Sequence, residues 1–436
     1  MIKSEGLRRY AANTGWLLGE QVSRFIAVFV GGLLVARYLG PSDFGILSFA
    51  LSFVGLFMFF GTLGMFNVLG RDLVKFPEQA GVIVATSFTM MLTASFGVFL
   101  LVLAVAWVFV GHSRGFDLIA VISAACLFQF FFVVDAFFQS KVRGKVTSIA
   151  RSLAFLVSTV FKIFLIWIEA PLIYFAVALM LDTALVGLFH GVAFLRFSRL
   201  DFGTLRVRSE TAKHLLSESW PFILSGASMA VYVKIDVVMI QWLLTEYDVG
   251  QYVGAARISE AVYFVPGAIT SALYPAIVNA KQKSVDLYKS RLSNLYSFLF
   301  FASLAYAACL ALLSGPIIQI LLGQQYLEAT SVLVLHVWAS IFVFLGYANS
   351  KWLLTEGLQI YFAANTAIGA VVNVLLNLIL VPLYSIEGAA IATVISYAVS
   401  AYLSMLIWPK TRENFYLLSR SMIANPLKIN LNPKAA

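Results

Sequence analysis

The chain has 436 residues, of which 61% are hydrophobic and only 12% are charged, and its formal net charge is +9. An ordinary soluble domain carries about 25% charged residues, so a soluble fold is excluded and most of the chain must lie in lipid. The positive charge falls in loops between apolar segments, which indicates membrane orientation and gives no reason to expect a nucleic-acid partner.

Twelve membrane spans are predicted, because a crossing takes about 20 apolar residues. The predicted spans cover residues 14–38, 43–68, 79–110, 116–139, 146–168, 171–195, 219–244, 249–276, 292–314, 329–353, 358–381 and 387–409. The first apolar run is longer than that of a signal peptide and lacks a cleavage site, so we expect it to stay as the first span. The polar tail, residues 410–436, contains two prolines, and we expect it to be loosely ordered.

The basic residues give the spans a direction. Twenty-three of the 30 Lys and Arg residues fall in the two termini and in alternate loops, six lie within spans, and only Arg114 lies on the opposite side. Loops rich in Lys and Arg stay in the cytoplasm. The sequence therefore predicts that both termini are cytoplasmic, which requires an even number of spans.

The two halves of the chain resemble each other. Residues 37–50 read RYLGPSDFGILSFA and residues 242–255 read WLLTEYDVGQYVGA, so that Asp43-x-Gly45 corresponds to Asp248-x-Gly250. Six spans return the chain to the same side, which makes this a parallel repeat. We expect an all-α membrane protein with an N-terminal six-helix lobe (1–200), a basic cytoplasmic linker (201–218), a C-terminal six-helix lobe (219–409) and a cytoplasmic tail (410–436).

Several charged residues lie deep within the predicted spans, where each would cost about 2.5–3.5 kcal/mol in lipid. Glu20 and Arg24 share a stripe of the first span, and Arg151 and Lys162 share a face of the fifth, about 16 Å apart. These side chains must face either water or a partner. Pairing alone is one interpretation, in which Glu20 neutralises Arg24, Glu260 neutralises Arg257, and Asp182 and Asp236 balance Lys162 and Lys234. The asparagines of the eleventh span could likewise hold helices together.

No enzyme motif accompanies these charges. The sequence contains no P-loop, nucleophile elbow, HExxH motif or catalytic pair of carboxylates, and the predicted outer loops are too short for a catalytic loop. The four His and two Cys residues have no metal-binding spacing. We therefore expect neither catalysis nor a cofactor or metal.

The segment from Asn13 to Leu73, with NTGWLLGEQVSRF and ARYLGPSDFGILSFA, resembles the polysaccharide flippases, the Wzx-like branch of the multidrug/oligosaccharidyl-lipid/polysaccharide exporter superfamily. WPFILSGASMAVYVKIDVVMIQWLL and DVGQYVGAARISEAVYFVPGAI carry the likeness in the second half. The resemblance implies a V-shaped fold like that of multidrug and toxin extrusion (MATE) transporters, with two lobes around a cavity. It also implies that an undecaprenyl-pyrophosphate-linked oligosaccharide (an O-antigen, capsule or exopolysaccharide repeat unit) crosses the bacterial inner membrane by alternating access, coupled to an ion gradient. Polysaccharide polymerase or chain-length proteins would be the partners.

Related flippases line the cavity with basic residues, so the resemblance assigns roles to the charges in the spans. Arg24, Lys162 and Lys234 would bind the pyrophosphate with help from Arg151 and Arg257, and Asn373 and Asn377 would contact sugars. Asp182 or Asp236 would carry the coupling ion, and Glu20 and Asp135 are further candidates. The alternatives are a multidrug or cation antiporter of the same superfamily, a polysaccharide polymerase or ligase, and a component of a glycan-export complex without transport activity. An antiporter would need a cavity rich in acids, and a polymerase would need a large outer loop.

Overall fold

The computed structural model describes residues 2–198 and 200–423, and the regular structure of this part is helical. Ten helical segments are long and apolar enough to cross a membrane. Eight of them each contain one predicted span. The other two, Gly19–Lys75 and Gln359–Leu406, are 57 and 48 residues long and each contain two predicted spans. The twelve predicted spans are therefore all helical, and the chain is a multi-pass membrane protein.

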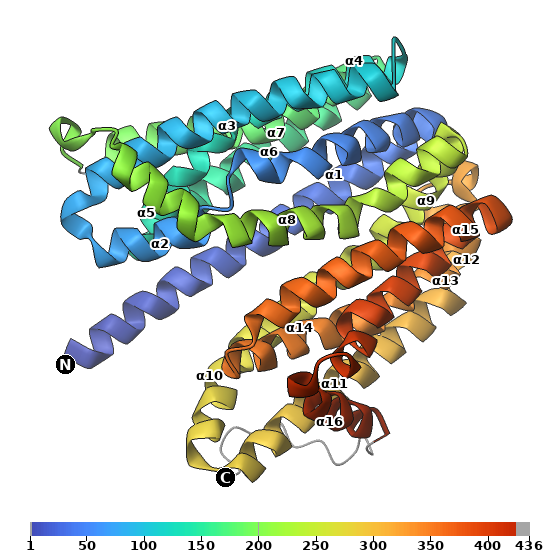
Figure 1. Ribbon diagram of the computed structural model, residues 1–436. Coiled ribbons are helices and arrows are strands. Elements are labelled where there is room, and N and C mark those ends of the chain that lie inside the picture. Colours follow the sequence, from blue (N-terminus) through green and yellow to red (C-terminus); the bar gives the residue numbers. More distant parts are fainter. Residues whose placement is uncertain (1, 199, 424–436) are drawn as a thin grey trace. The chain divides into compact units, whose positions relative to one another are not determined.

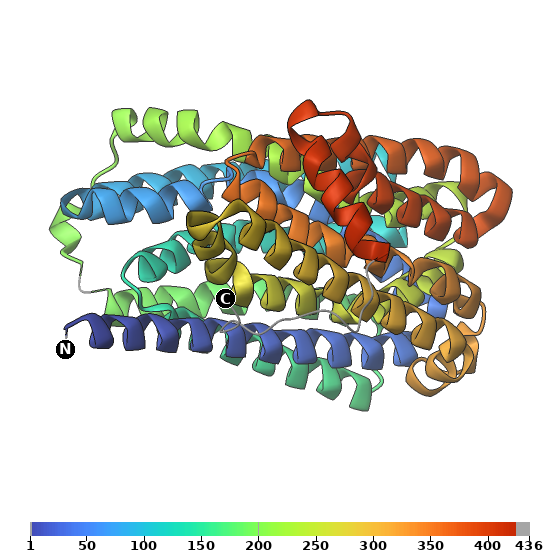
Figure 2. The ribbon, with the colours of Figure 1, turned by 90° about the horizontal axis from the view of Figure 1, so that it is seen from below.

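Each of the two longest segments is bent where one predicted span ends and the next begins. Helix α1 (Ile2–Gly61) has a non-helical residue at Gly40, with φ of 75°, and Pro41 follows it. Glycine accepts this left-handed backbone without a steric penalty, and proline removes a helical N–H. Helix α15 (Gln359–Ala401) bends at Tyr384 and Ser385, shortly after Pro382. Figure 2 shows how long the first arm of α1 is before its bend.

The chain divides into two compact units. The N-terminal unit comprises the residues up to Leu39 together with Ile46–Ala230, and the C-terminal unit comprises Gly40–Gly45 together with the residues from Val231 onward. The short corner of α1 therefore belongs to the C-terminal unit although both arms of α1 belong to the other. Helix α8 (Ser209–Leu243) begins in the first unit and ends in the second.

In the N-terminal unit, α7 lies beside both α6 and α4, and α3 lies beside α4 (Figure 1). A buried apolar core at one end joins α2, α3, α5 and α7, with Leu69, Ile83, Phe137 and Ala193 among its members. Besides α1 and α8, the helices of this unit are α2 (Phe66–Lys75), α3 (Ala80–Phe109), α4 (Arg114–Ser123), α5 (Phe132–Ser140), α6 (Gly144–Trp167) and α7 (Leu172–Phe197).

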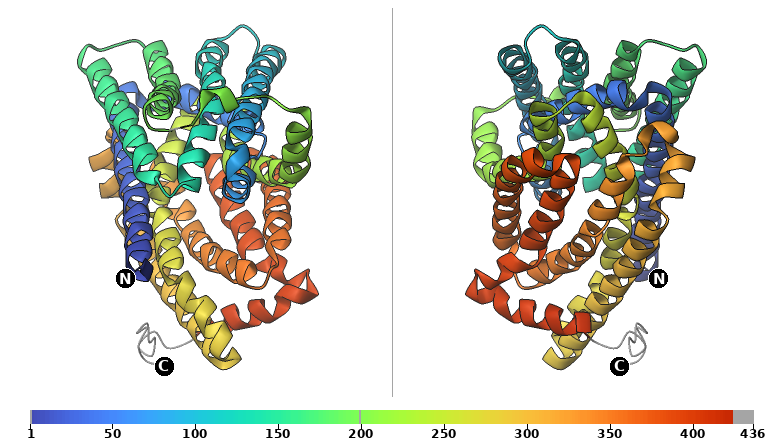
Figure 3. Two further views of the ribbon diagram at one scale, coloured as in Figure 1. Left: turned by 90° about the vertical axis from the view of Figure 1, so that its left-hand side faces the viewer. Right: turned by 90° about the vertical axis from the view of Figure 1, so that its right-hand side faces the viewer.

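The helices of the C-terminal unit, besides the end of α8, are α9 (Glu246–Ser259), α10 (Phe264–Lys283), α11 (Val285–Leu312), α12 (Ser314–Leu321), α13 (Ala329–His336), α14 (Ala339–Thr355), α15 and α16 (Arg412–Ile423). The tail differs from its prediction, because α16 is an ordered helix that lies beside α11 (Figure 3). The Tyr296 hydroxyl donates to Asn414 Oδ1 at 2.9 Å, and Leu418 is fully buried. Polar side chains that bond to α11 thus order this part of the tail; residues 424–436 lie outside the described residues.

Three of the predicted spans are each divided between more than one helical element. The fourth span changes to a 3-10 segment, η2 (Ala124–Phe131), between α4 and α5. The tenth span breaks between α13 and α14. The eighth breaks at the 3-10 turn η4 (Glu260–Val262), where the Tyr306 hydroxyl donates to the carbonyl oxygens of Ile258 and Ser259, at 3.2 and 3.1 Å. A side chain thus satisfies carbonyl groups that the break would leave unpaired in lipid.

Candidate functional site

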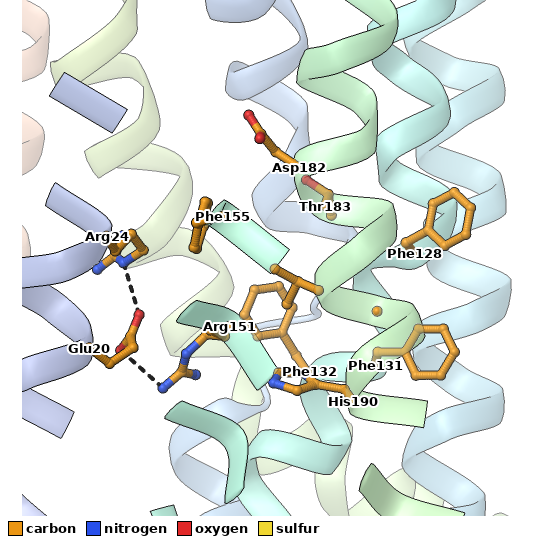
Figure 4. A pocket seen from close by; sticks show the side chains of 12 residues that line it. Glu20, Arg24, Phe128, Phe131, Phe132, Arg151, Phe155, Asp182, Thr183 and His190 are labelled. Atoms are coloured by element: carbon orange, nitrogen blue, oxygen red, sulfur yellow. Dashed lines mark hydrogen bonds and ion pairs between the residues drawn. The ribbon is translucent and has the colours of Figure 1, made fainter. Parts of the chain in front are cut away.

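A pocket of about 370 Å³ lies within the N-terminal unit, between α1, η2, α5, α6 and α7 (Figure 4). One part of its wall is charged or polar and the other is aromatic. The lining residues are Glu20, Arg24, Phe128, Phe131, Phe132, Arg151, Phe155, Asp182, Thr183, Val186, Gly187 and His190. Apolar walls lower the local dielectric constant, which strengthens every charge interaction inside the pocket.

Glu20 stands between two arginines at one side of this pocket (Figure 4). Its Oε1 lies 3.2 Å from Arg24 Nε, one helical turn further along α1, and its Oε2 lies 3.3 Å from the terminal amino group of Arg151 on α6. Arg151 also lies 2.6 Å from Asp135 Oδ2 on α5. The predicted pair of Glu20 and Arg24 thus forms, and it belongs to a larger network that joins three helices.

A second ion pair lies further along α6. Lys162 Nζ is 2.7 Å from Asp182 Oδ2 on α7, and the Ser158 hydroxyl also bonds to Asp182. Here the pairing interpretation is the one that the structure supports, since the carboxylate already has a cation and a hydroxyl. The two cations of the fifth span, Arg151 and Lys162, therefore each have a carboxylate partner.

Some hydrogen-bond donors in the pocket remain unused. Arg24 is 45% exposed at its side chain and bonds to Glu20 through Nε. The Nε atom of Arg151 and the Nε2 atom of His190 are buried without a partner. The acceptor Asp135 Oδ1 is also without a partner. A ligand rich in hydrogen-bond acceptors, such as a sugar or a phosphate, would satisfy the donors of the two arginines.

The sequence prediction missed His190 as part of this site. A single histidine in an apolar span gives no signal by itself. A weak signal exists in its spacing from Thr183 and Gly187, because positions i, i+4 and i+7 share a helix face. At Gly187 an added Cβ would lie 2.7 Å from the ring of Phe131, so glycine is needed for the aromatic wall to approach α7.

The network predicts which arginine stabilises the fold. Replacing Arg151 with Ala leaves the buried carboxylates of Asp135 and Glu20 without this partner, and losing one side of a buried pair costs about 3–5 kcal/mol. We expect a clearly lower melting temperature for this variant, measured on purified protein in detergent. The control is Arg24→Ala, where a half-exposed pair contributes under about 1 kcal/mol. Equal melting temperatures for the two variants would mean that Arg151 has no stabilising role.

The C-terminal unit contains a buried carboxylate with an entirely different set of partners. Asp236, on α8, is 5% exposed. Its Oδ1 accepts a bond from Asn377 Nδ2 at 2.7 Å, and its Oδ2 accepts bonds from the hydroxyls of Thr393 at 2.7 Å and Tyr252 at 3.1 Å. Asn373 extends the network, since its Oδ1 lies 3.2 Å from Asn377 Nδ2. The structure thus brings Asp236, Asn373 and Asn377 together, which the sequence did not predict as one cluster.

This cluster has the chemistry of a site for a small cation. Among the described residues, no Lys or Arg forms an ion pair with Asp236, and the Oδ1 of Asn377 is buried without a partner. Carboxylate, amide and hydroxyl oxygens are the ligands that hard cations prefer. The interpretation in which Asp236 neutralises Lys234 thus has no ion pair to support it among the described residues.

Lys234 and Arg257 are the cations of the C-terminal unit. Both side chains are partly exposed, and Glu260 is exposed. Neither forms an ion pair within 4 Å of a carboxylate among the residues that the structure describes. Arg257 instead lies over the ring of Phe44, at 5.1 Å from its centroid. The pairing of Arg257 with Glu260, considered from the sequence, fails because α9 ends at Ser259 and η4 changes the helical register.

Comparisons with known proteins identify similar sequences that are named for glycan or polysaccharide biosynthesis or as a membrane protein. Residues 10–281 match the family model described as "Polysaccharide biosynthesis protein". A relative from Haloferax volcanii, named "Probable low-salt glycan biosynthesis flippase Agl15", is 27% identical over 199 residues, which cover 44% of this chain and 41% of that protein. An "Uncharacterized membrane protein MJ1375" of Methanocaldococcus jannaschii is 26% identical over 58% of this chain and 55% of its own length. The chain thus spans about half the length of the curated relatives it matches.

Solved structures of membrane transporters resemble this chain over more than 90% of its length. An inward-facing multidrug resistance MATE transporter has a TM-score of 0.72 at 17% identity, covering 91% of this chain and 96% of its own. The lipid II flippase MurJ, in an inward closed conformation, has a TM-score of 0.69 at 14% identity, with 94% and 90% covered. The fold is thus MATE-like, as expected from the sequence. Since the family model matches more than half of its length, the chain belongs to the polysaccharide biosynthesis protein family.

Proposed function

We propose that the protein is a flippase that moves an undecaprenyl-pyrophosphate-linked oligosaccharide across the bacterial inner membrane by alternating access. Its termini lie in the cytoplasm, as the loop charges predict. The observation that carries this proposal is the presence of Lys234 and Arg257 in apolar spans without a carboxylate partner within 4 Å among the described residues. Unpaired cations are costly in lipid, so they serve an anionic, hydrated group. The family and the flippase named among the relatives support the choice of substrate.

The pyrophosphate binds to the C-terminal unit in this proposal. Lys234 and Arg257 have hydrogen-bond donors to offer to phosphate oxygens, and such charge-assisted bonds are among the strongest in proteins. In the N-terminal unit, Arg151 and Lys162 already have carboxylates within 3.3 Å. In this proposal Lys234 and Arg257 therefore bind the pyrophosphate, and Arg151 and Lys162 do not.

The N-terminal pocket binds the sugars. Its lining contains two arginines and two carboxylates, so it has little net charge for a pyrophosphate, while the unused donors of Arg24 and Arg151 suit hydroxyl and carbonyl oxygens. Phe128, Phe131, Phe132 and Phe155 supply apolar faces against which sugar rings pack. Polar side chains of the pocket also replace the hydrogen bonds to water that the glycan loses as it leaves the cytoplasm.

Asp236 binds the coupling ion, a proton or a sodium ion. The other candidates are less suitable, because Asp182 is held by Lys162 and Ser158, and Glu20 and Asp135 are held by Arg151. Asp236 has only neutral hydrogen-bond donors around it among the described residues. A cation bound there would neutralise a charge that is otherwise buried. Binding of the ion would therefore stabilise the conformation in which Asp236 is buried, which links ion binding to the conformational change of the transporter.

A strain that lacks the gene tests the function in the cell. We expect this strain to lose the surface polysaccharide and to accumulate the lipid-linked repeat unit in its inner membrane, and the intact gene to restore export. A strain that exports normally but becomes sensitive to cationic drugs would instead favour the antiporter of the same superfamily. Normal lipid-linked intermediates together with long, unregulated chains would indicate a partner of the polymerase or chain-length proteins.

A further inference from the structure

Four charged or titratable side chains join the beginning of α8 to α2, which lies beside it in the N-terminal unit (Figure 1). Asp72 on α2 is 3% exposed at its side chain, and its Oδ2 lies 3.1 Å from His214 Nε2 on α8. Its Oδ1 lies 2.8 Å from Arg71 Nε, and Arg71 also bonds to Glu218 on α8 at 2.9 Å. His214 and Glu218 are four residues apart, so the two contacts lie one helical turn apart. We call these four residues the α2–α8 latch.

The latch positions a short arm of α8, residues 209–220, which precedes Pro221. Leu215 of this arm is fully buried in the apolar core of the unit. Just before the arm, the N–H of Arg208 donates to the Thr86 hydroxyl at 3.2 Å. A helix of about ten residues is only marginally stable by itself in water. Contacts with the rest of the N-terminal unit therefore decide how firmly the arm is held.

The charges of the latch balance only when His214 is protonated. Asp72 and Glu218 supply two negative charges, and Arg71 supplies one positive charge. Histidine is the side chain whose charge ordinarily changes between about pH 5 and 8, and a protonated His214 adds the second positive charge. An incompletely neutralised carboxylate is unfavourable at a buried position such as Asp72. A charge-assisted hydrogen bond is also about twice as strong as a neutral one, so protonation strengthens the contact of His214 with Asp72.

The other charged residues on the surrounding elements do not replace His214. Those that are exposed are Lys75, Glu78, Arg206, Arg208, Glu210 and Lys213. Salt screens exposed charges, so they act weakly on the buried carboxylate. Asp135 on α5 is paired with Arg151, and α3 contains no charged residue.

We propose that the α2–α8 latch is a pH-sensitive switch that slows transport when the cytoplasm becomes acidic. His214 lies in the linker 201–218, which the loop charges predict to be cytoplasmic. At low pH a protonated His214 holds the arm against α2, and this hold weakens as the pH rises and the imidazole loses its proton. The same helix later carries Lys234 and Asp236, the proposed ligands of the pyrophosphate and of the coupling ion. A firmly held arm restrains this helix during alternating access. The effect on transport rests on the proposed function, whereas the latch itself does not.

The first test measures hydrogen–deuterium exchange of the backbone amides of residues 209–220 in the purified full-length protein. The parent and His214→Gln are compared at the same pH, so the intrinsic pH dependence of exchange cancels. Gln can donate a neutral hydrogen bond, as neutral histidine does. We expect exchange to be about fivefold slower in the parent than in His214→Gln at about pH 6, and equal at about pH 8. The control is His112→Gln, expected to match the parent at both pH values, because the His112 ring packs on Trp107 with 4.2 Å between centroids.

Equal exchange in the parent and in His214→Gln at about pH 6 would overturn the latch. A second comparison identifies the partner of His214. In a protein that already carries Asp72→Asn, adding His214→Gln is expected to change nothing at either pH. A remaining difference of about fivefold would show that His214 acts through another group and that the assigned latch is wrong. If Asp72→Asn does not fold, the comparison of the parent with His214→Gln decides.

Transport is then measured in proteoliposomes with the same pH on both sides, so that no proton gradient is present. At about pH 6 the parent is expected to translocate the lipid-linked oligosaccharide about fivefold more slowly than His214→Gln, and at about pH 8 equally fast. If exchange shows the latch but both proteins transport at equal rates at about pH 6, the regulatory role is overturned and the proposed function stands. If the correctly inserted parent transports at neither pH, the proposed function fails, and with it the regulation of transport.

Discussion

Replacing Lys234 with Gln is expected to reduce transport of the lipid-linked oligosaccharide more than any other substitution of a single cation. Lys234 is part of an apolar span and forms no ion pair within 4 Å among the described residues, so its charge is available to the pyrophosphate. A hydrogen bond to a charged group contributes about 1.5–3 kcal/mol, which corresponds to binding that is about 10- to 150-fold weaker when it is lost. The measurement is the dissociation constant for pyrophosphate together with export in a null strain.

Two variants make this expectation specific. Lys283→Gln removes the same charge from an exposed position at the end of α10 and is expected to bind pyrophosphate and export polysaccharide normally. Lys234→Arg retains a positive charge and is expected to keep part of the affinity. If Lys234→Gln inserts properly and binds pyrophosphate as tightly as the parent, the assignment of the pyrophosphate to this cation is wrong.

Asp236→Asn is expected to abolish the response of transport to an ion gradient. The amide has nearly the same shape and can still bond to Thr393 and Asn377, but it cannot carry the charge that a coupling cation neutralises. Moving one elementary charge across 100 mV supplies about 2.3 kcal/mol, enough for a roughly 50-fold concentration ratio. In proteoliposomes with an imposed gradient, the parent should concentrate the substrate, and the variant should only equilibrate it.

The matched control for this experiment is Asp117→Asn, which lies exposed in the first turn of α4. It should respond to the gradient as the parent does. Separate proton and sodium gradients identify the ion. If Asp236→Asn keeps the full response to both gradients while Asp182→Asn loses it, the coupling site lies in the N-terminal unit and our choice between the two acids is wrong.

The sequence predicted the spans and the pair of Glu20 with Arg24 correctly because both depend on short-range rules. Apolar runs of sufficient length must be helical in lipid, and the bend at Gly40 falls between two predicted spans. Glu20 and Arg24 are one helical turn apart, so their contact follows from helix geometry. The contact of Lys162 with Asp182 was one of two open interpretations, and it needed the packing of α6 on α7 to decide it.

The remaining features depend on how distant helices pack. The network around Arg151 joins residues 20, 135 and 151 on three helices, and Asp236 meets residues that lie 141 and 157 positions later in the chain. Periodicity cannot predict such contacts. The pairing of Arg257 with Glu260 failed because a 3-10 turn intervenes. The tail was expected to be loosely ordered because it is polar and contains two prolines, and the hydrogen bonds that join α16 to α11 could not be predicted. The repeated Asp-x-Gly segments were recognised, but only the structure brings them into contact.

The most direct test of the account is headgroup translocation by the purified protein. Liposomes that contain an undecaprenyl-pyrophosphate-linked oligosaccharide in both leaflets are treated from outside with a glycosidase that cannot cross the membrane. Without protein, only the outer-leaflet half of the oligosaccharide is cleaved. With the parent protein we predict that cleavage proceeds to nearly all of it, and that cleavage beyond the outer half is much slower with Lys234→Gln. Cleavage that stops at the outer half with the correctly inserted parent protein would contradict the proposal that this chain is a flippase.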